Sequence, residues 1–288
     1  MPPLYTALKI PAFDLSWLTV LHEGEFEEVI LIVGGGGSAK TGVPNCIQVA
    51  KRGKKFGELM FLKDYHTDSM ALSISCIQDG VSFINMQLVL VGLEGGACKL
   101  LTATKNTNDE NIYFSELASF QADFCEIKEE SSIDCSLILK NGKIVTGGHD
   151  GVCRLWALSL DEVENKWSIH LDEELVTHKM GVSSLCVHPT ESWICSGGKD
   201  GHIFIIDINE NKNLWGKATS TDYIKNFKPG KFPINELECK GVCFSVNGDH
   251  LFSIQCSRRG PTYLVKWSIE KIGKPNDPDF KLKLEPIM

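Results

Sequence analysis

One glycine-rich segment near the N-terminus has the residue types and spacing that could do chemistry. The apolar run Val29–Val33 leads into four glycines, Gly34–Gly37, and then into Ser38–Thr41. This run differs from the phosphate-binding motif GxxxxGK[ST] only by Ala39 in place of the last glycine. A phosphate-binding loop needs a helix directly after its Lys-Thr pair, because the helix N-terminus supplies the amide donors. Here Gly42–Pro44 follows, and proline disfavours that helix, so we do not expect nucleotide hydrolysis.

Two other interpretations of this segment stay open. It is either a plain turn between two strands or a protrusion whose backbone amides and carbonyls bind an ion or a partner. From Gly35 to Gly42 the segment is four residues longer than the comparable turns Gly148–Gly151 and Gly198–Gly201. A structural turn needs neither that insertion nor four successive glycines, which lose much conformational entropy on folding. The length therefore favours the functional protrusion.

The histidines and cysteines do not form a pattern typical of a metal or hydrolytic site. The sequence has no HxH, HExxH, CxxC or GxSxG motif, and His178, His188 and His202 flank one repeat at unrelated spacings. We interpret His178 as a structural side chain that hydrogen-bonds to Asp200 or Asp150 in a turn. The 11 cysteines, an odd number, lie mostly in apolar runs, which indicates reduced, buried thiols in a cytosolic protein.

Composition and charge exclude several classes of function. The 288-residue chain has a formal net charge of −8, which argues against nucleic acid or anionic lipid as the main partner. The acidic run Glu23–Glu28 is interpreted as solvated surface, and the basic spot Cys256–Gly260 as the rim of a turn. The apolar runs are too short for a signal peptide or a membrane span.

A repeat organises the chain around these residues. Its clearest copies, Thr146–Trp156 and Ser196–Ile206, each contain a small residue, two glycines, a link with Asp, a third glycine and a short apolar strand. The third glycines of all five copies have spacings of 54, 55, 50 and 59 residues, and they are Gly42, Gly96, Gly151, Gly201 and Gly260. This period lies somewhat above the roughly 40–50 residues usual for propeller blades.

The segments between these glycines are typical of β-hairpins. Gly181–Val187 is a short run rich in β-branched residues, and turn signals occur at His188–Glu191 and Asn247–Asp249. Only Asp161–Trp167 and Asn108–Gln121 are expected to hold a helical turn or a polar excursion. The predicted fold class is all-β with radial repetition.

These residues resemble the WD-repeat β-propellers, in which a Gly-Asp-Gly turn joins the third and fourth strands of a blade and Trp closes the fourth. The resemblance implies one propeller domain over residues 1–288. Such propellers usually have seven blades and this length provides for about five, so we expect a chain that lacks its C-terminal blades.

The glycine-rich segment is more specific. It is similar to the potassium-binding loop of the endoplasmic-reticulum guanine-nucleotide exchange factors of the COPII pathway, the family that includes the prolactin regulatory element-binding protein. The resemblance implies that a loop binds the GDP or nucleotide-free form of the small Ras-like GTPase that initiates COPII budding, without covalent chemistry. The residues carried over as the GTPase-binding loop are Gly34, Gly35, Gly36, Gly37, Ser38, Ala39, Lys40, Thr41, Gly42, Pro44 and Asn45.

The same resemblance implies a potassium ion at Gly36, Gly37, Ser38 and Asn45. We expect the Asn45 amide to hold the ion or the loop and Lys40 to place charge near the GTPase. Family members carry a membrane anchor near the C-terminus that residues 280–288 do not contain, so the expected location is the cytosolic face of the endoplasmic reticulum for the full-length protein and the cytosol for this chain. The alternative is a WD-repeat scaffold in trafficking without exchange activity.

Overall fold

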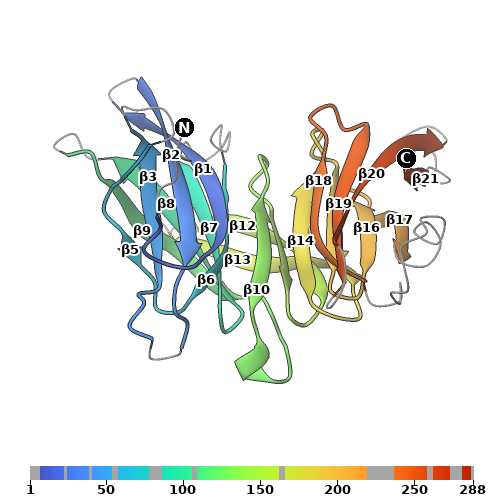
Figure 1. Ribbon diagram of the computed structural model, residues 1–288, viewed down its shortest axis with the longest axis horizontal. Helices are drawn as coiled ribbons and strands as arrows, with labels where there is room; N and C mark the ends of the chain where they lie inside the picture. The colour runs from blue at the N-terminus through green and yellow to red at the C-terminus, as the bar shows by residue number, and fades with distance from the viewer. Residues whose placement is uncertain are drawn as a thin grey trace. The chain divides into compact units, whose positions relative to one another are not determined.

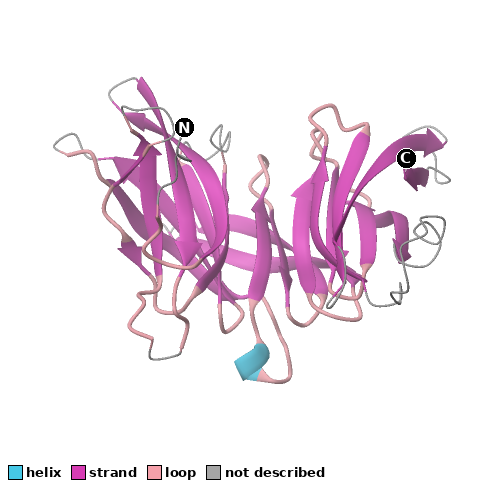
Figure 2. Cartoon of the chain, viewed as in Figure 1, coloured by secondary structure: helices cyan, strands magenta, loops and turns pink. Residues whose placement is uncertain are grey.

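The computed structural model describes residues 7–22, 25–38, 41–53, 58–77, 86–105, 109–161, 166–218, 237–257, 262–272 and 281–286. Nearly all of the regular structure is β-strand (Figure 2). The one helix in these ranges is a single 3-10 turn, η1 (Lys128–Glu130). No helix within the described ranges is long and apolar enough to cross a membrane. The prediction of an all-β fold is confirmed.

The strands of the described residues form five antiparallel sheets, and within each sheet the strands lie side by side in chain order, apart from β5 (Figure 1). The first sheet contains β1 (Ala12–His22), β2 (Glu25–Gly34), β3 (Cys46–Arg52) and β4 (Leu59–Phe61), with β5 (Tyr65–His66) also paired to β3. The second contains β6 (Ala71–Cys76), β7 (Gln87–Leu93), β8 (Ala97–Lys105) and β9 (Ile112–Gln121).

The other three sheets have four strands each. The third contains β10 (Ile133–Ile138), β11 (Ile144–Gly148), β12 (Val152–Asp161) and β13 (Lys166–Thr177). The fourth contains β14 (Val182–Val187), β15 (Trp193–Gly198), β16 (His202–Asp207) and β17 (Lys212–Ala218). The fifth contains β18 (Leu237–Phe244), β19 (His250–Ser257), β20 (Thr262–Ile272) and β21 (Lys281–Pro286). About five blades were expected, and five sheets are present.

The repeated third glycines lie in the turns between the second and third strands. Gly96, Gly151 and Gly201 have φ values of 78°, 81° and 75° and Gly42, in the longer loop, has 76°. This left-handed conformation favours glycine over residues with a Cβ atom. Gly260 lies outside the described residues. The repeat read from the sequence therefore marks the same turn in successive sheets.

The helical alternatives offered for two segments were wrong where the structure describes them. Ile112–Gln121 is strand β9, and Asp161 and Lys166–Trp167 belong to β12 and β13. Both β9 and β13 are the fourth strands of their sheets and have many exposed side chains. Their polarity reflects an outer position in the sheet and not a helix or an excursion.

By its internal contacts the chain divides into two compact units. The first consists of Met1–Val145 and Trp156–Leu171, and the second of Thr146–Leu155 and Asp172–Met288. The expectation of one domain stays a prediction, and each unit has its own core.

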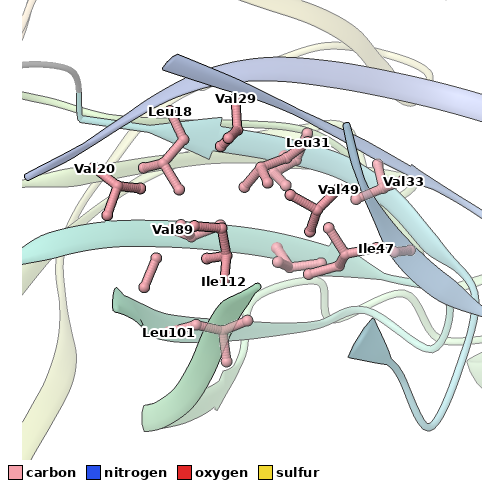
Figure 3. Packing of buried hydrophobic residues seen from close by; sticks show 14 of the residues in the cluster. Leu18, Val20, Val29, Leu31, Val33, Ile47, Val49, Val89, Leu101 and Ile112 are labelled. Atoms are coloured by element: carbon pink, nitrogen blue, oxygen red, sulfur yellow. The ribbon is translucent and has the colours of Figure 1, made fainter. Parts of the chain in front are cut away.

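One of the two buried clusters of the first unit lies between the first and second sheets. Leu18, Val29 and Leu31 are fully buried on one side, and they meet Val89 and Leu101 from β7 and β8 (Figure 3). Successive residues of a strand point to opposite faces, so Leu18 is buried while its neighbour Trp17 is 50% exposed. Each fully buried aliphatic side chain contributes about 1.5–3 kcal/mol relative to an exposed one.

The core of the second unit joins the fourth and fifth sheets. Trp267, the largest fully buried side chain, packs near Trp215 with ring centroids 5.9 Å apart. Its indole N–H donates a hydrogen bond to Ser253 Oγ at 2.9 Å, so the polar end of the ring is satisfied inside the core.

Side chains of the first strands also link neighbouring sheets through main-chain N–H groups. Within the first unit, Asp14 Oδ2 accepts from Ile74 N–H at 2.9 Å. Ser75 Oγ accepts from Ile138 N–H at 3.1 Å. In the second unit, Ser184 Oγ accepts from Val242 N–H at 3.1 Å. A polar side chain of one first strand thus binds the backbone of the next.

Candidate functional site

The glycine-rich loop, residues 34–45, connects β2 to β3 in the first sheet. Gly34 is the last residue of β2 and pairs with both Ala12 of β1 and Cys46 of β3. The loop therefore leaves the sheet at its central strands, where both ends are held by strand pairing. A strand follows the loop, not a helix, so the helix that a phosphate-binding loop requires is not there.

Several glycines of the loop are required by the path of the chain, and two of them lie beside Asn45. A Cβ atom on Gly35 would lie 2.2 Å from Asn45 Oδ1, which no side chain could tolerate without movement. Gly37 has φ +67°, in the left-handed region. Gly35 allows close approach of the Asn45 side chain, and Gly37 allows the chain to reverse beside it.

Asn45 holds the loop through both ends of its side-chain amide. Gly37 N–H donates to Asn45 Oδ1 at 3.0 Å, and Asn45 Nδ2 donates to Gly37 O at a longer 3.5 Å. We call this pair of contacts the Asn45 clamp. At the other end of the described loop, Val43 N–H donates to Thr41 Oγ1 at 3.3 Å. The loop is thus closed by its own side chains.

The structure brings several of the predicted site residues together and leaves two undescribed. Gly35, Gly37 and Asn45 form the closed part of the loop. Gly36 is packed within it, since a Cβ atom there would lie 2.1 Å from Thr41 Oγ1. Ser38 is exposed. The residues Gly34, Gly42 and Pro44 lie along the same path, whereas Ala39 and Lys40 lie outside the described residues.

The described residues of the loop offer several neutral oxygen atoms. Gly37 O, Ser38 Oγ and Asn45 Oδ1 are the kind of neutral oxygen ligands that suit a hard cation. Asn45 Oδ1 has two lone pairs and the Asn45 clamp uses one, so the other is left for an ion. Such groups can bind an ion or a partner.

Sequence reasoning missed one residue beside this loop. Ser38 Oγ donates a hydrogen bond at 3.4 Å to Glu94 Oε1, from the turn between β7 and β8 in the second sheet. The two residues are 56 positions apart in the chain, and no local pattern connects them. The one available signal was that Glu94 precedes a turn glycine pair in a degenerate copy of the repeat.

The histidine expected to be structural has that role. His178, 3% exposed, lies with Nδ1 3.1 Å from Asp200 Oδ1 and Nε2 2.9 Å from Ser196 Oγ. Burial alone would raise the pKa of Asp200, but hydrogen bonds from His178 and from the N–H groups of Lys179 and His202 lower it well below its usual range. Of the two partners that were open, Asp200 is the one observed.

Comparison with known proteins identifies the repeat to which this histidine belongs. The family described as WD domain, G-beta repeat matches residues 171–207. This range covers His178, the turn with Asp200, and strands β14 to β16.

Two curated fungal proteins are similar over a part of the chain. They are MST50-interacting protein 11 of Pyricularia oryzae and small ribosomal subunit protein RACK1 of Neurospora crassa, each 29% identical over 94 residues. The match covers 32% of this chain and only 27% of the length of each relative.

Solved structures are similar over most of the chain. A chain from the humanized Chaetomium thermophilum Polycomb Repressive Complex 2 bound to the inhibitor GSK126 has a TM-score of 0.56 at 13% identity, over 94% of this chain and 55% of that one. A chain of the Mitotic Checkpoint Complex has a TM-score of 0.56 at 12% identity, over 92% of this chain and 63% of that one. At such low identity these likenesses show the fold alone. Residues 171–207 thus match a WD repeat, and the chain has the all-β fold of the WD-repeat β-propellers, with four antiparallel sheets of four strands and one of five.

Proposed function

We propose that this protein is a guanine-nucleotide exchange factor for the small Ras-like GTPase that initiates COPII budding, and that it acts through the glycine-rich loop. The Asn45 clamp carries the proposal. It holds Gly37 by its N–H and its C=O, at 3.0 and 3.5 Å, in a loop four residues longer than the comparable turns of the clearest repeats. A loop whose main chain is held by hydrogen bonds at Gly37 is suited to binding another protein.

The physical basis of exchange is coupling between two binding equilibria. A protein that binds the nucleotide-free GTPase more tightly than the GDP form must weaken GDP binding by the same factor. A loop that is already ordered loses less conformational entropy when it docks, which leaves more of the interaction energy for that coupling. No covalent step is needed, and this protein is therefore proposed not to be an enzyme in the covalent sense.

A potassium ion is part of the proposal. Gly36, Gly37, Ser38 and Asn45 would hold it, and its role would be to stiffen the loop further. The full-length protein is proposed to lie at the endoplasmic-reticulum membrane on the cytosolic side, where the GDP-bound GTPase is its partner.

A second candidate is a WD-repeat scaffold without exchange activity. Its support comes from the names of similar proteins: a small ribosomal subunit protein, an interacting protein, and chains within two multiprotein complexes. A scaffold function would require the sheets but would not require the long glycine-rich loop.

Release of fluorescent GDP from the purified COPII GTPase separates the two candidates. The wild-type protein in potassium buffer is expected to accelerate release, with a smaller effect in sodium. Asn45→Ala should reduce the acceleration about tenfold, since losing hydrogen bonds of about 1 kcal/mol each opens the loop.

The matched control is Asn141→Ala. Asn141 Oδ1 accepts from Lys143 N–H at 3.0 Å in the turn between β10 and β11, so it caps an ordinary hairpin in the same unit. This control should keep full activity. Equal activity of Asn45→Ala and wild type would remove the loop from the mechanism. No acceleration by wild-type protein that circular dichroism shows to be folded would favour the scaffold.

A further inference from the structure

The main chain of Glu94 is fixed by neighbouring segments of the first unit. Glu94 N–H donates to Met70 O at 2.9 Å, and Ser69 Oγ donates to Glu94 O at 3.1 Å. Glu94 also forms an isolated antiparallel bridge with Ser132. Its position is therefore determined by the fold of the second and third sheets and does not depend on the glycine-rich loop.

The carboxylate of Glu94 lies against the loop. Ser38 Oγ donates to Glu94 Oε1 at 3.4 Å, and a Cβ atom on Gly37 would lie 3.3 Å from Oε2. Gly37 is the residue that the Asn45 clamp holds from the other direction. Gly37 and Ser38 thus contact both the Asn45 amide of their own sheet and the Glu94 carboxylate of the next.

One short segment joins these two contacts. Thr67 N–H donates to Asn45 O at 3.0 Å, while Ser69 and Met70 hold the main chain of Glu94. Asn45 and Glu94 are consequently tied to the same stretch, residues 67–70, which connects the first sheet to the second.

The turn that contains Glu94 departs from the other turns of the repeat. In the third and fourth sheets an aspartate precedes the turn glycine and caps its own turn: Asp150 Oδ1 accepts from Val152 N–H and Asp200 Oδ1 from His202 N–H, both at 3.0 Å. Gly95 occupies that position in the second sheet. The acidic residue stands one position earlier, and its carboxylate contacts the loop of the preceding sheet instead of its own turn.

We infer that Glu94 is a positioning residue for the glycine-rich loop. Its carboxylate, held in place by the second sheet, fixes the position of Gly37 and Ser38 and so determines how the loop contacts a protein partner. The inference rests on the proposed function for its consequence, but its structural part concerns the loop of the free protein. Loss of the carboxylate is expected to let the Asn45 clamp open more often.

Two measurements on the full chain test this inference. The first is hydrogen exchange at the Gly37 amide, read by mass spectrometry with electron-transfer fragmentation. The second is GDP release, with KM for the GTPase and kcat determined separately. Glu94→Ala should speed exchange at Gly37 about two- to threefold, as expected for losing one long, exposed hydrogen bond, and should raise KM with little change in kcat.

Three further variants separate positioning from general effects. Glu94→Gln keeps an acceptor for Ser38 Oγ and should restore wild-type exchange and KM. Ser38→Ala should match Glu94→Ala, and the double variant should be no worse than either. Asp68→Asn is the charge control, because Asp68 is 86% exposed, pairs with Lys99 at 2.6 Å and lies in the same connecting segment. It should leave exchange at Gly37 unchanged.

Unchanged Gly37 exchange in Glu94→Ala would overturn the inference, as would an equal effect of Asp68→Asn. Faster exchange in Glu94→Ala, corrected by Glu94→Gln, would support it even if the wild-type protein did not release GDP. In that case the proposed function would fail and the positioning role would stand.

Discussion

His178 lies with its Nδ1 atom 3.1 Å from a carboxylate oxygen of Asp200, and this contact joins the segment before β14 to the turn between β15 and β16. The other ring nitrogen, Nε2, lies 2.9 Å from Ser196 Oγ. Lys179 N–H donates to the second carboxylate oxygen at 2.9 Å. Both polar ends of a buried imidazole are therefore satisfied, and three segments of the fourth sheet are held together.

Asp200→Ala is expected to lower the free energy of unfolding by about 2–4 kcal/mol, because it leaves His178 and two N–H groups without their partner. Urea unfolding followed by circular dichroism measures the change. Asp207→Ala is the control, since Asp207 caps Asn209 N–H at 2.9 Å in an exposed turn of the same sheet. If both variants lost a similar free energy of unfolding, the buried contacts of Asp200 would not account for its contribution to stability.

Lowering the pH should weaken the same network and destabilise the protein, because the pKa of Asp200 is lowered in the folded state. Hydrogen bonds lower the folded-state pKa of Asp200 below its ordinary value of 3.8, against the opposing effect of burial. Its stabilising contribution is then complete above about pH 5 and is lost as the pH falls below 3.8 towards the folded-state value. Unfolding midpoints between pH 5 and pH 2.5 should fall more steeply for wild type than for Asp200→Ala.

His188 should make the protein less stable in mildly acidic solution. Burial lowers the pKa of His188 below 6.5, and its ring packs between Trp193 and Phe244 with centroids at 4.7 and 5.1 Å. The unfolded chain then binds a proton at higher pH than the folded protein, so stability decreases as the pH falls through 6.5. The unfolding midpoint should drop between pH 7.5 and 5.5, and less so in His188→Asn.

The control is His170→Asn, at an exposed position of β13, which should keep the pH dependence of the wild type. If His188→Asn also had the same pH dependence as the wild type, His188 would not be the cause of the lower stability in acid.

Two adjacent glycines should respond differently to the same substitution. Gly95 and Gly96 have φ values of 88° and 78°, so alanine is strained at both. A Cβ atom on Gly95 would meet nothing within 4 Å, whereas one on Gly96 would lie 2.1 Å from Ser131 Oγ. Gly95→Ala should lower the free energy of unfolding by about 1 kcal/mol, from the backbone alone, and Gly96→Ala by about 2–4 kcal/mol. Thermal unfolding of the two proteins side by side gives the difference, and equal values would show that the local packing can relax.

Native thiol labelling should begin at Cys243. Of the 11 cysteines, Cys243 is the one with an exposed side chain, and none of the 11 forms a disulfide. Burial raises the pKa of Cys153 and Cys239 to about 12, which keeps both thiols protonated and unreactive. Alkylation at pH 8 followed by peptide mass spectrometry should modify Cys243 first and the buried pair only after unfolding. Cys243→Ser should remove the earliest phase; early labelling of Cys153 would instead reveal local opening of the second unit.

The residues that sequence could identify are those whose partners lie within one repeat. Val182–Val187, the turn glycines Gly151 and Gly201, and the pair His178 and Asp200 all follow from local spacing in the repeat. β9 was not identified, because an outer strand exposes polar side chains and loses the alternation typical of a half-buried strand.

The glycine-rich loop was predictable in part for the same reason. The Asn45 amide lies eight positions from Gly37, and that it would hold the loop or an ion was expected from the family resemblance of this segment. Glu94 was not found, because its contact with Ser38 depends on how two sheets pack. What this loop binds stays a prediction.

The side chains that link the first strands of neighbouring sheets have a consequence for sequence divergence. Asp14, Ser75 and Ser184 each bind a main-chain N–H, and every amino acid except proline carries that group. The hydrogen bond therefore does not depend on which side chain the donating residue carries, provided that it is not proline, and only the residue that accepts the hydrogen bond must stay polar. Copies of the repeat can drift far from one another while their sheets remain joined, which accounts for a fold that is regular where its sequence repeat is degenerate.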